Sequence, residues 1–155
     1  MNGVELFLLG RTLMKIGEEA LPTEGLDAQP GGHRSVLIVA SDIREHPDSS
    51  VGEIAVRTGL PQSQVSTCVA RLREAGSIVT AADPKDRRRL LVRQAPEISE
   101  RVAAVRAAPI DSALTAALGT DDPQRVGEVT AALETLARHL SPQALTRLHS
   151  GDPGQ

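Results

Sequence analysis

The sequence predicts a mainly α-helical fold that carries one small β-hairpin, an α+β class in which helices dominate. Apolar residues recur at helical spacing along most of the 155 residues, and glycine and proline mark the ends of short helices. Only one stretch, residues 77–94, changes to short β-rich runs. With 40% hydrophobic residues but one Phe and no Trp or Tyr, the core must be aliphatic. That composition argues against the aromatic platforms that stack single-stranded bases.

A short helix is expected directly after Ser50. Ser50 and Glu53 have the S-x-x-E spacing of a capping box, in which each side chain binds the other residue's backbone N–H. The helix should therefore begin at Val51. Gly59 should end it, because glycine adopts the positive φ of a helix terminus without strain.

A second helix is expected over residues 62–76, because Pro61 is tolerated only at the start of a helix and Gly76 supplies a stop. Its apolar face has helical spacing and comprises Val65, Cys68, Val69 and Leu72. The opposite face carries groups that hydrogen-bond base edges or phosphates, namely Gln62, Ser63, Ser66, Thr67 and Arg71, with the small Ala70. Two helices joined by a sharp turn, the second polar on one face, are typical of a DNA-reading unit.

The runs SIVTAA and LLVRQ predict a hairpin around the loop 83–89. This loop holds four cations, Lys85, Arg87, Arg88 and Arg89. Such a loop suits contact with a phosphate backbone and insertion of an arginine into a narrow minor groove. Because DNA repels a carboxylate, we expect Asp86 to be an internal partner that aims the guanidinium of Arg88.

The formal net charge of −3 is unevenly distributed. Residues 51–93 hold eight Lys or Arg and four acids, which gives +4 there and leaves −7 for the rest. A basic face on an acidic body orients a protein on a polyanion, whereas a non-specific binder would be basic throughout. The expected partner is double-stranded DNA.

Residues 50–92 closely resemble the MarR family of bacterial winged helix-turn-helix repressors. The resemblance is carried by D-P-x-D-R-R at the wing tip and L-x-x-A-G-x-[IV] before the wing. It implies a homodimer with two recognition helices in successive major grooves of a roughly palindromic operator and its wings in flanking minor grooves. Two positions depart from the family pattern: Ser66 stands where many members carry a basic residue, and Gln94-Ala95 replaces leucine-threonine.

The remaining segments are expected to be helical. In order, the sequence predicts a helix over 4–20, a loop over 21–32, a helix from His33 to His46, a helix from Pro96 to Gly119 with a break near Pro109, a helix from Asp121 or Asp122 to His139, and a short helix from Ser141. The expected domains are 1–32 (dimerisation), 33–95 (DNA binding), 96–150 (dimerisation) and 151–155 (tail). The terminal segments are more apolar than solvated helices need to be, which favours burial across a two-fold axis.

Three sets of residues have two interpretations each. Cys68 is either a redox switch or, as its apolar neighbours favour, a core residue. Arg11 either anchors an anionic effector, which the resemblance implies for a pocket near the first helix, or it snorkels to solvent or pairs with an acid of the other subunit. The histidines His33, His46, His139 and His149 lack metal-motif spacing, so we expect no metal site.

The expected function is a sequence-specific transcriptional regulator, a homodimeric repressor that a small anionic effector releases. Catalytic motifs are missing, so no enzymatic activity and no cofactor are expected. The absence of a signal-peptide pattern and of a long apolar run, with a single cysteine, predicts a cytoplasmic protein without membrane contact. Two alternatives stay open, a winged-helix module for protein interaction and a constitutive DNA binder without effector.

Overall fold

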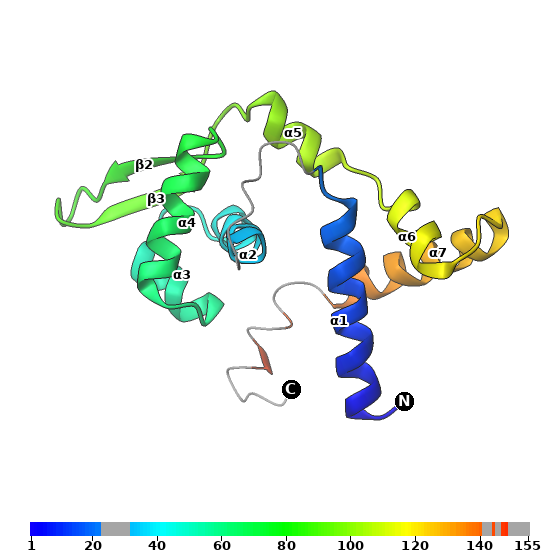
Figure 1. Cartoon of the computed structure of the whole chain (residues 1–155). Coiled ribbons are helices and arrows are strands. Elements are labelled where there is room, and N and C mark those ends of the chain that lie inside the picture. The colour runs from blue at the N-terminus through cyan, green and yellow to red at the C-terminus, as the bar shows by residue number, and fades with distance from the viewer. Residues whose placement is uncertain (23–31, 141–143, 145–146, 149–155) are drawn as a thin grey trace. The chain divides into compact units, whose positions relative to one another are not determined.

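The computed structural model describes residues 1–22, 32–140, 144, 147 and 148. Their backbone forms two compact units (Figure 1). The winged unit consists of residues 23–107, and the terminal unit combines residues 1–22 with 108–155.

The winged unit contains four helices and a three-stranded antiparallel sheet. Its elements are α2 (Gly32–Glu45), β1 (Ser49–Ser50), α3 (Val51–Thr58), α4 (Gln62–Glu74), β2 (Ile78–Ala82), β3 (Leu90–Gln94) and α5 (Glu100–Ala107). Helix α2 packs against both α3 and α4, and the long hairpin of β2 and β3 projects beyond them (Figure 1). The aliphatic core between these elements comprises Val39, Ile43, Ile54, Val65, Cys68, Val69, Leu72, Ile78 and Val92.

The local signals at the helix-turn-helix are confirmed. Ser50 and Glu53 form both hydrogen bonds of the capping box at the start of α3. Gly59 ends that helix in the left-handed region at φ 70°, and Gly76 adopts φ 75° after α4. The turn between the two helices therefore uses the one residue type that enters this region without strain.

The hairpin is confirmed, and a third strand joins it. Strands β2 and β3 pair from Ile78 opposite Gln94 to Ala82 opposite Leu90. Strand β1 pairs with the other edge of β3, so the order is β1-β3-β2. The sequence did not predict β1, because two residues are too short to show the alternation that identifies a strand.

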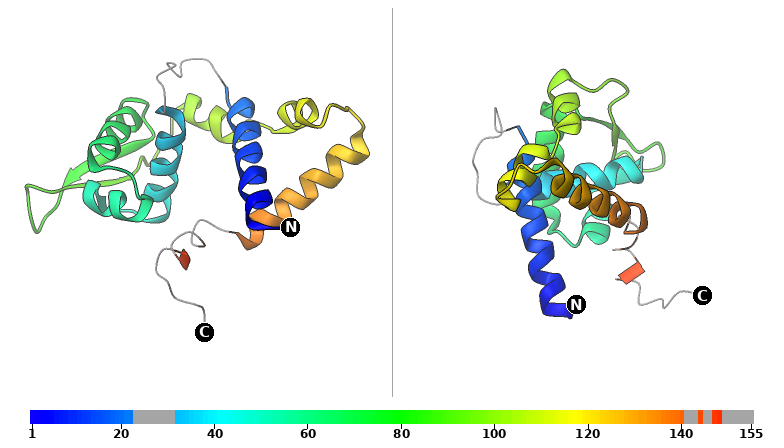
Figure 2. Two further views of the ribbon diagram at one scale, coloured as in Figure 1. Left: turned by 60° about the horizontal axis from the view of Figure 1, so that its bottom comes forward. Right: turned by 90° about the vertical axis from the view of Figure 1, so that its right-hand side faces the viewer.

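Helices also make up the terminal unit where residues 1–22 and 108–140 describe it. They are α1 (Gly3–Ala20), α6 (Asp111–Leu118) and α7 (Pro123–His139). Helix α1 packs on α6, and α6 packs on α7 (Figure 2). Leu114 of α6 is buried, whereas α1 and α7 contain no buried residue.

Two expectations along the C-terminal half need comment. The helix expected from Pro96 begins instead at Glu100, because the Ser99 hydroxyl accepts a hydrogen bond from the Val102 N–H and fixes the start there. The break near Pro109 is confirmed, since α5 and α6 are separate helices. Most of the loop expected over 21–32, most of the short helix expected from Ser141 and the tail 151–155 lie outside the described residues.

Candidate nucleic-acid interface

Helix α4 buries its apolar face and exposes its polar face. The buried side chains are Val65, Cys68, Val69 and Leu72. The exposed residues are Gln62, Ser63, Ser66, Thr67 and Ala70, with Arg73 and Glu74 in the last turn. Gln64, between the two faces, donates a hydrogen bond of 2.6 Å from its Nε2 to the Ser35 hydroxyl of α2. The rotation of α4 about its axis is thus fixed by the core and by a polar contact.

Arg71 does not share the exposed face, although the sequence placed it there. It is partly buried, and its guanidinium lies against the start of α2. A Cβ added to Gly32 would lie 2.6 Å from Nη1 of Arg71, so the end of the arginine side chain would have to move to admit one. Arg71 lies four residues after Thr67 and so shares its face by helical spacing. That spacing does not indicate where α2 approaches α4.

The wing loop is folded by its two aspartates. The Asp83 carboxylate accepts a 2.9 Å hydrogen bond from the N–H of Lys85, and the Asp86 carboxylate accepts one of 3.0 Å from the N–H of Arg88. Asp86 is therefore an internal partner of Arg88, as expected, but through the main chain and not through the guanidinium. The side chains of the loop cations are left at the surface, at Lys85, Arg87, Arg88 and Arg89.

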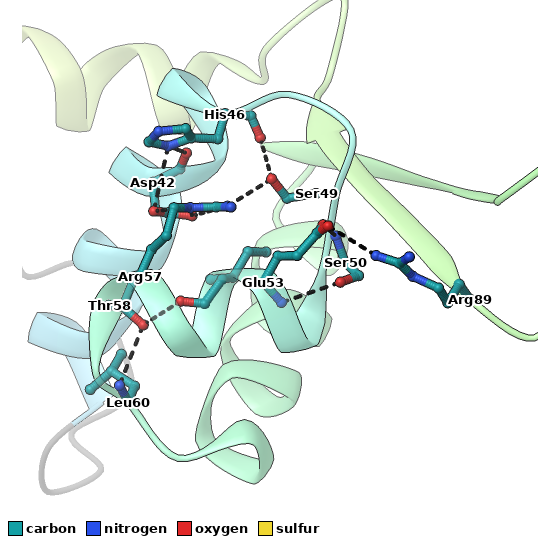
Figure 3. A network of polar contacts seen from close by, with 10 residues as sticks. Asp42, His46, Ser49, Ser50, Glu53, Arg57, Thr58, Leu60 and Arg89 are labelled. Atoms are coloured by element: carbon teal, nitrogen blue, oxygen red, sulfur yellow. Dashed lines mark hydrogen bonds and ion pairs between the residues drawn. The ribbon is translucent and has the colours of Figure 1, made fainter. Parts of the chain in front are cut away.

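Helices α2 and α3 are joined by a polar network around Arg57 (Figure 3). Its Nε and Nη2 donate to the Asp42 carboxylate at 2.9 and 2.7 Å, and Nη2 also donates to the Ser49 hydroxyl at 2.7 Å. The hydrogen bond to Asp42 and its negative charge raise the pKa of Arg57. Arg57 therefore contributes to the contacts between α2, α3 and Ser49.

Two ion pairs connect strand β3 and the wing to the residues before and within α3. Nη2 of Arg89 lies 3.0 Å from Oε1 of Glu53, as Figure 3 shows, and Nη2 of Arg93 lies 2.6 Å from Oδ1 of Asp48. The hydrogen bond from the Ser50 N–H, with a smaller contribution from Arg89, lowers the pKa of Glu53. No local sequence pattern indicates these pairs, since their members are far apart along the chain.

Cys68 and the histidines show no binding chemistry in the described residues. The Cys68 side chain is buried in the core, and burial raises the pKa of its thiol. Among the residues that the structure describes, no group of three His, Cys, Asp or Glu is placed to hold a metal ion. His149 lies outside them.

The exposed polar face of α4, the sharp turn at Gly59 and the basic hairpin define the winged unit as a winged helix-turn-helix domain. The family model described as MarR family matches residues 36–89. The resemblance seen in the sequence is confirmed, since the match falls on the residues that carry it. The match spans α2, the helix-turn-helix and the wing tip.

Solved structures share the fold at low sequence identity. The transcriptional regulator PA4135 is 19% identical, with 99% of both chains covered and a TM-score of 0.57. The YusO protein from Bacillus subtilis is 22% identical, with 89% of this chain and 99% of that chain covered and a TM-score of 0.54. A probable transcriptional regulator from Pseudomonas aeruginosa is 22% identical, with 84% and 94% covered and a TM-score of 0.50.

No curated protein matches the sequence. Within the described residues, no single helix is both long and apolar enough to cross a membrane. The family whose model matches residues 36–89 consists of transcriptional regulators and not of enzymes.

Proposed function

We propose that the protein is a homodimeric transcriptional repressor that binds a palindromic operator in double-stranded DNA. The observation that carries this proposal is the exposed polar face of α4 beside a basic wing. The helix presents Ser63, Ser66 and Thr67 to solvent while its other face is fixed in the core. A helix held in this way enters a major groove as a rigid body, and the wing reaches the flanking minor groove.

The division of charge supports the same partner. The loop over 83–89 exposes four cations, and its two aspartates are engaged in hydrogen bonds to the loop's main chain. DNA therefore meets guanidinium and ammonium groups at the wing tip rather than free carboxylates. A module for protein interaction has no need of this concentration of positive charge.

The exposed apolar side chains of α1 support a homodimer. Leu6, Phe7 and Leu8 are exposed, and no residue of α1 is buried within one chain. Leaving such a helix in water is unfavourable by about 25 cal/mol for each Å² of apolar surface. A second copy would cover the same face on both chains, as a two-fold axis requires. Operator binding in successive major grooves requires the two copies of α4 to lie roughly 34 Å apart.

Selection of bound duplexes from a random DNA pool, followed by a salt titration of the selected sequence, tests this function. A palindromic motif with half-sites about 10 base pairs apart, and affinity that falls steeply with salt, is the expected result. A folded dimer that enriches no sequence would contradict operator binding and favour the interaction module. Sedimentation of the same sample measures the oligomeric state.

We also propose that a small anionic molecule releases the operator, with Arg11 as its anchor. Arg11 is an exposed cation on α1, which suits an anion contact and equally suits a stem lying along apolar surface. A thermal-shift screen of aromatic carboxylates separates the two, since stabilisation that disappears in Arg11→Ala is expected only of an anchor. Operator binding without any response to the screened ligands would indicate a constitutive DNA binder. The expected location of such a regulator is the cytoplasm.

A further inference from the structure

The arginine at the base of the wing differs from those at the tip. The guanidinium of Arg89 lies 3.0 Å from the carboxylate of Glu53, whereas Arg87 and Arg88 are exposed at the tip. Both partners of the pair are about half exposed, at 45% and 49%. The cations of the loop over 83–89 are thus not equivalent, although the sequence treats all of them as DNA contacts.

Glu53 has two structural roles at once. Its carboxylate accepts a 2.7 Å hydrogen bond from the backbone N–H of Ser50, which closes the capping box of α3, and it pairs with Arg89 (Figure 3). Because the capping box already restricts the Glu53 side chain, the side-chain entropy lost in forming the ion pair comes mainly from Arg89. The start of α3 is therefore a fixed point to which the wing is attached.

Two further contacts attach the same region of the sheet. Strand β1 pairs with β3 at Ser49 opposite Val92, and Arg93 pairs with Asp48 at 2.6 Å. These contacts hold the middle and far part of β3, whereas Arg89 precedes the strand on the side of the loop. Of these three contacts, the Glu53–Arg89 pair is the one that lies nearest the loop over 83–89.

We propose that Arg89 and Glu53 are positioning residues that set the angle of the wing against α3, and that Arg89 does not itself contact DNA. This inference rests on the proposed operator binding. If Arg89 left Glu53 for a phosphate, an unpaired carboxylate would remain beside the polyanion, which opposes the exchange. Keeping the pair neutralises Glu53 and aims the remaining wing cations.

Operator affinity and its salt dependence separate a positioning residue from a phosphate contact. The variants are Arg89→Ala and Glu53→Gln, the latter chosen because glutamine also serves in a capping box. The matched control is Arg87→Ala, at the exposed tip. We expect both members of the pair to lose about two- to fivefold in affinity with the salt slope of wild type. The control should reduce the slope by about 0.9, the value of one lost phosphate contact.

The double variant provides a second criterion. Glu53→Gln with Arg89→Ala should bind no more weakly than either single variant, because either change alone already removes the interaction. A reduced salt slope in Arg89→Ala, or tighter binding in Glu53→Gln, would overturn the proposal, since both are expected when Arg89 touches phosphate and Glu53 repels it.

A measurement without DNA distinguishes failure of this inference from failure of operator binding. In the free protein, amide hydrogen exchange over residues 83–89 should become about two- to fivefold faster in Arg89→Ala and in Glu53→Gln, and not in Arg87→Ala. Unchanged exchange in the first two variants would contradict the positioning role even if wild type binds its operator. Faster exchange in a protein that binds no DNA would leave the wing attachment intact and refute only the regulator function.

Discussion

Arg57 of α3 donates two parallel hydrogen bonds to the carboxylate of Asp42 on α2, from Nε to Oδ1 at 2.9 Å and from Nη2 to Oδ2 at 2.7 Å. Both side chains are mostly shielded from water, with 23% and 11% of their surfaces exposed. A fork of this geometry is stronger than an ordinary surface pair. It holds α3 on α2 beside Ser49, and so it stabilises the helix to which the wing is attached.

Loss of this fork should destabilise the winged unit. Arg57→Ala removes both hydrogen bonds of the fork from the shielded Asp42 and leaves it the longer contact with His46, at 3.6 Å. We expect the free energy of unfolding to fall by about 2 kcal/mol. Urea denaturation measures the change. Arg44→Ala on α2 is the control, because Arg44 is exposed, and it should change stability by less than about 0.5 kcal/mol. Equal effects of the two variants would contradict a structural role for the fork.

Gly59 should tolerate asparagine better than alanine. Its φ of 70° strains any side chain, although an added Cβ would meet no atom within 4 Å. Gly59→Ala should therefore cost about 1 to 2 kcal/mol of stability from backbone strain alone, and Gly59→Asn less, because asparagine enters the left-handed region more readily. Thermal unfolding of the two variants tests the order. A larger loss for asparagine would point to a steric cause.

Cys68 should behave as a core residue. Burial raises the pKa of its thiol above the ordinary value of 9.0, so the folded protein keeps it protonated at neutral pH. The stability that the fold gains by keeping this thiol neutral is present below the ordinary pKa, and it is lost as the pH rises through the raised pKa. A thiol reagent at about pH 8 should label the native protein slowly and the urea-unfolded protein fast. Rapid native labelling, or release of operator DNA by mild peroxide, would support a redox switch.

Base preference and salt dependence should be separable by mutation. Changes at Ser66 or Thr67 should alter which base is preferred by about 1 to 3 kcal/mol, because both side chains are exposed on α4. Arg88→Ala should instead weaken binding to all sequences with a shallower salt dependence. Competition binding with single-base operator variants measures both effects. Equal losses on every sequence for both classes of variant would refute this division.

The contribution of Glu53 should not vary near neutral pH. The hydrogen bond from Ser50, assisted by Arg89, lowers the pKa of Glu53 below its ordinary value of 4.5. The favourable interaction is therefore present above that ordinary value and is lost only as the pH falls through the lowered one. The ratio of operator affinities between wild type and Glu53→Gln should be constant from about pH 6 to 8. A ratio that falls toward 1 within this range would show that another group controls the wing.

The elements with local causes were predictable from the sequence. The capping box at Ser50 and Glu53, the left-handed Gly59 and the 3.6-residue spacing of the α4 core face each depend on neighbours within one or two turns. The hairpin followed from a change of period between Gly76 and Gln94. These features give the fold class and the exposed half of the recognition helix.

The features that the sequence did not predict depend on contacts between elements that are far apart along the chain. Arg71 has the spacing of an exposed residue, but it is partly buried and its guanidinium lies beside Gly32 at the start of α2. Arg89 was expected to contact DNA because it lies in a basic loop, and the fold also places its guanidinium 3.0 Å from Glu53, which is far away in sequence. Asp86 was expected to aim the guanidinium of Arg88, and the hydrogen bond that it accepts comes instead from the main chain of Arg88, which depends on backbone geometry that residue types do not specify.

The shared carboxylate of Glu53 also limits how the wing can evolve. A substitution at position 89 that removes the ion pair with this carboxylate changes the position of the wing as well as its charge. A substitution at position 53 changes the cap of α3 in addition to the ion pair. Sequence drift in one element is thus transmitted to the other. Among homologues that keep the same wing length, acidic residues at position 53 and basic residues at position 89 should be gained and lost together.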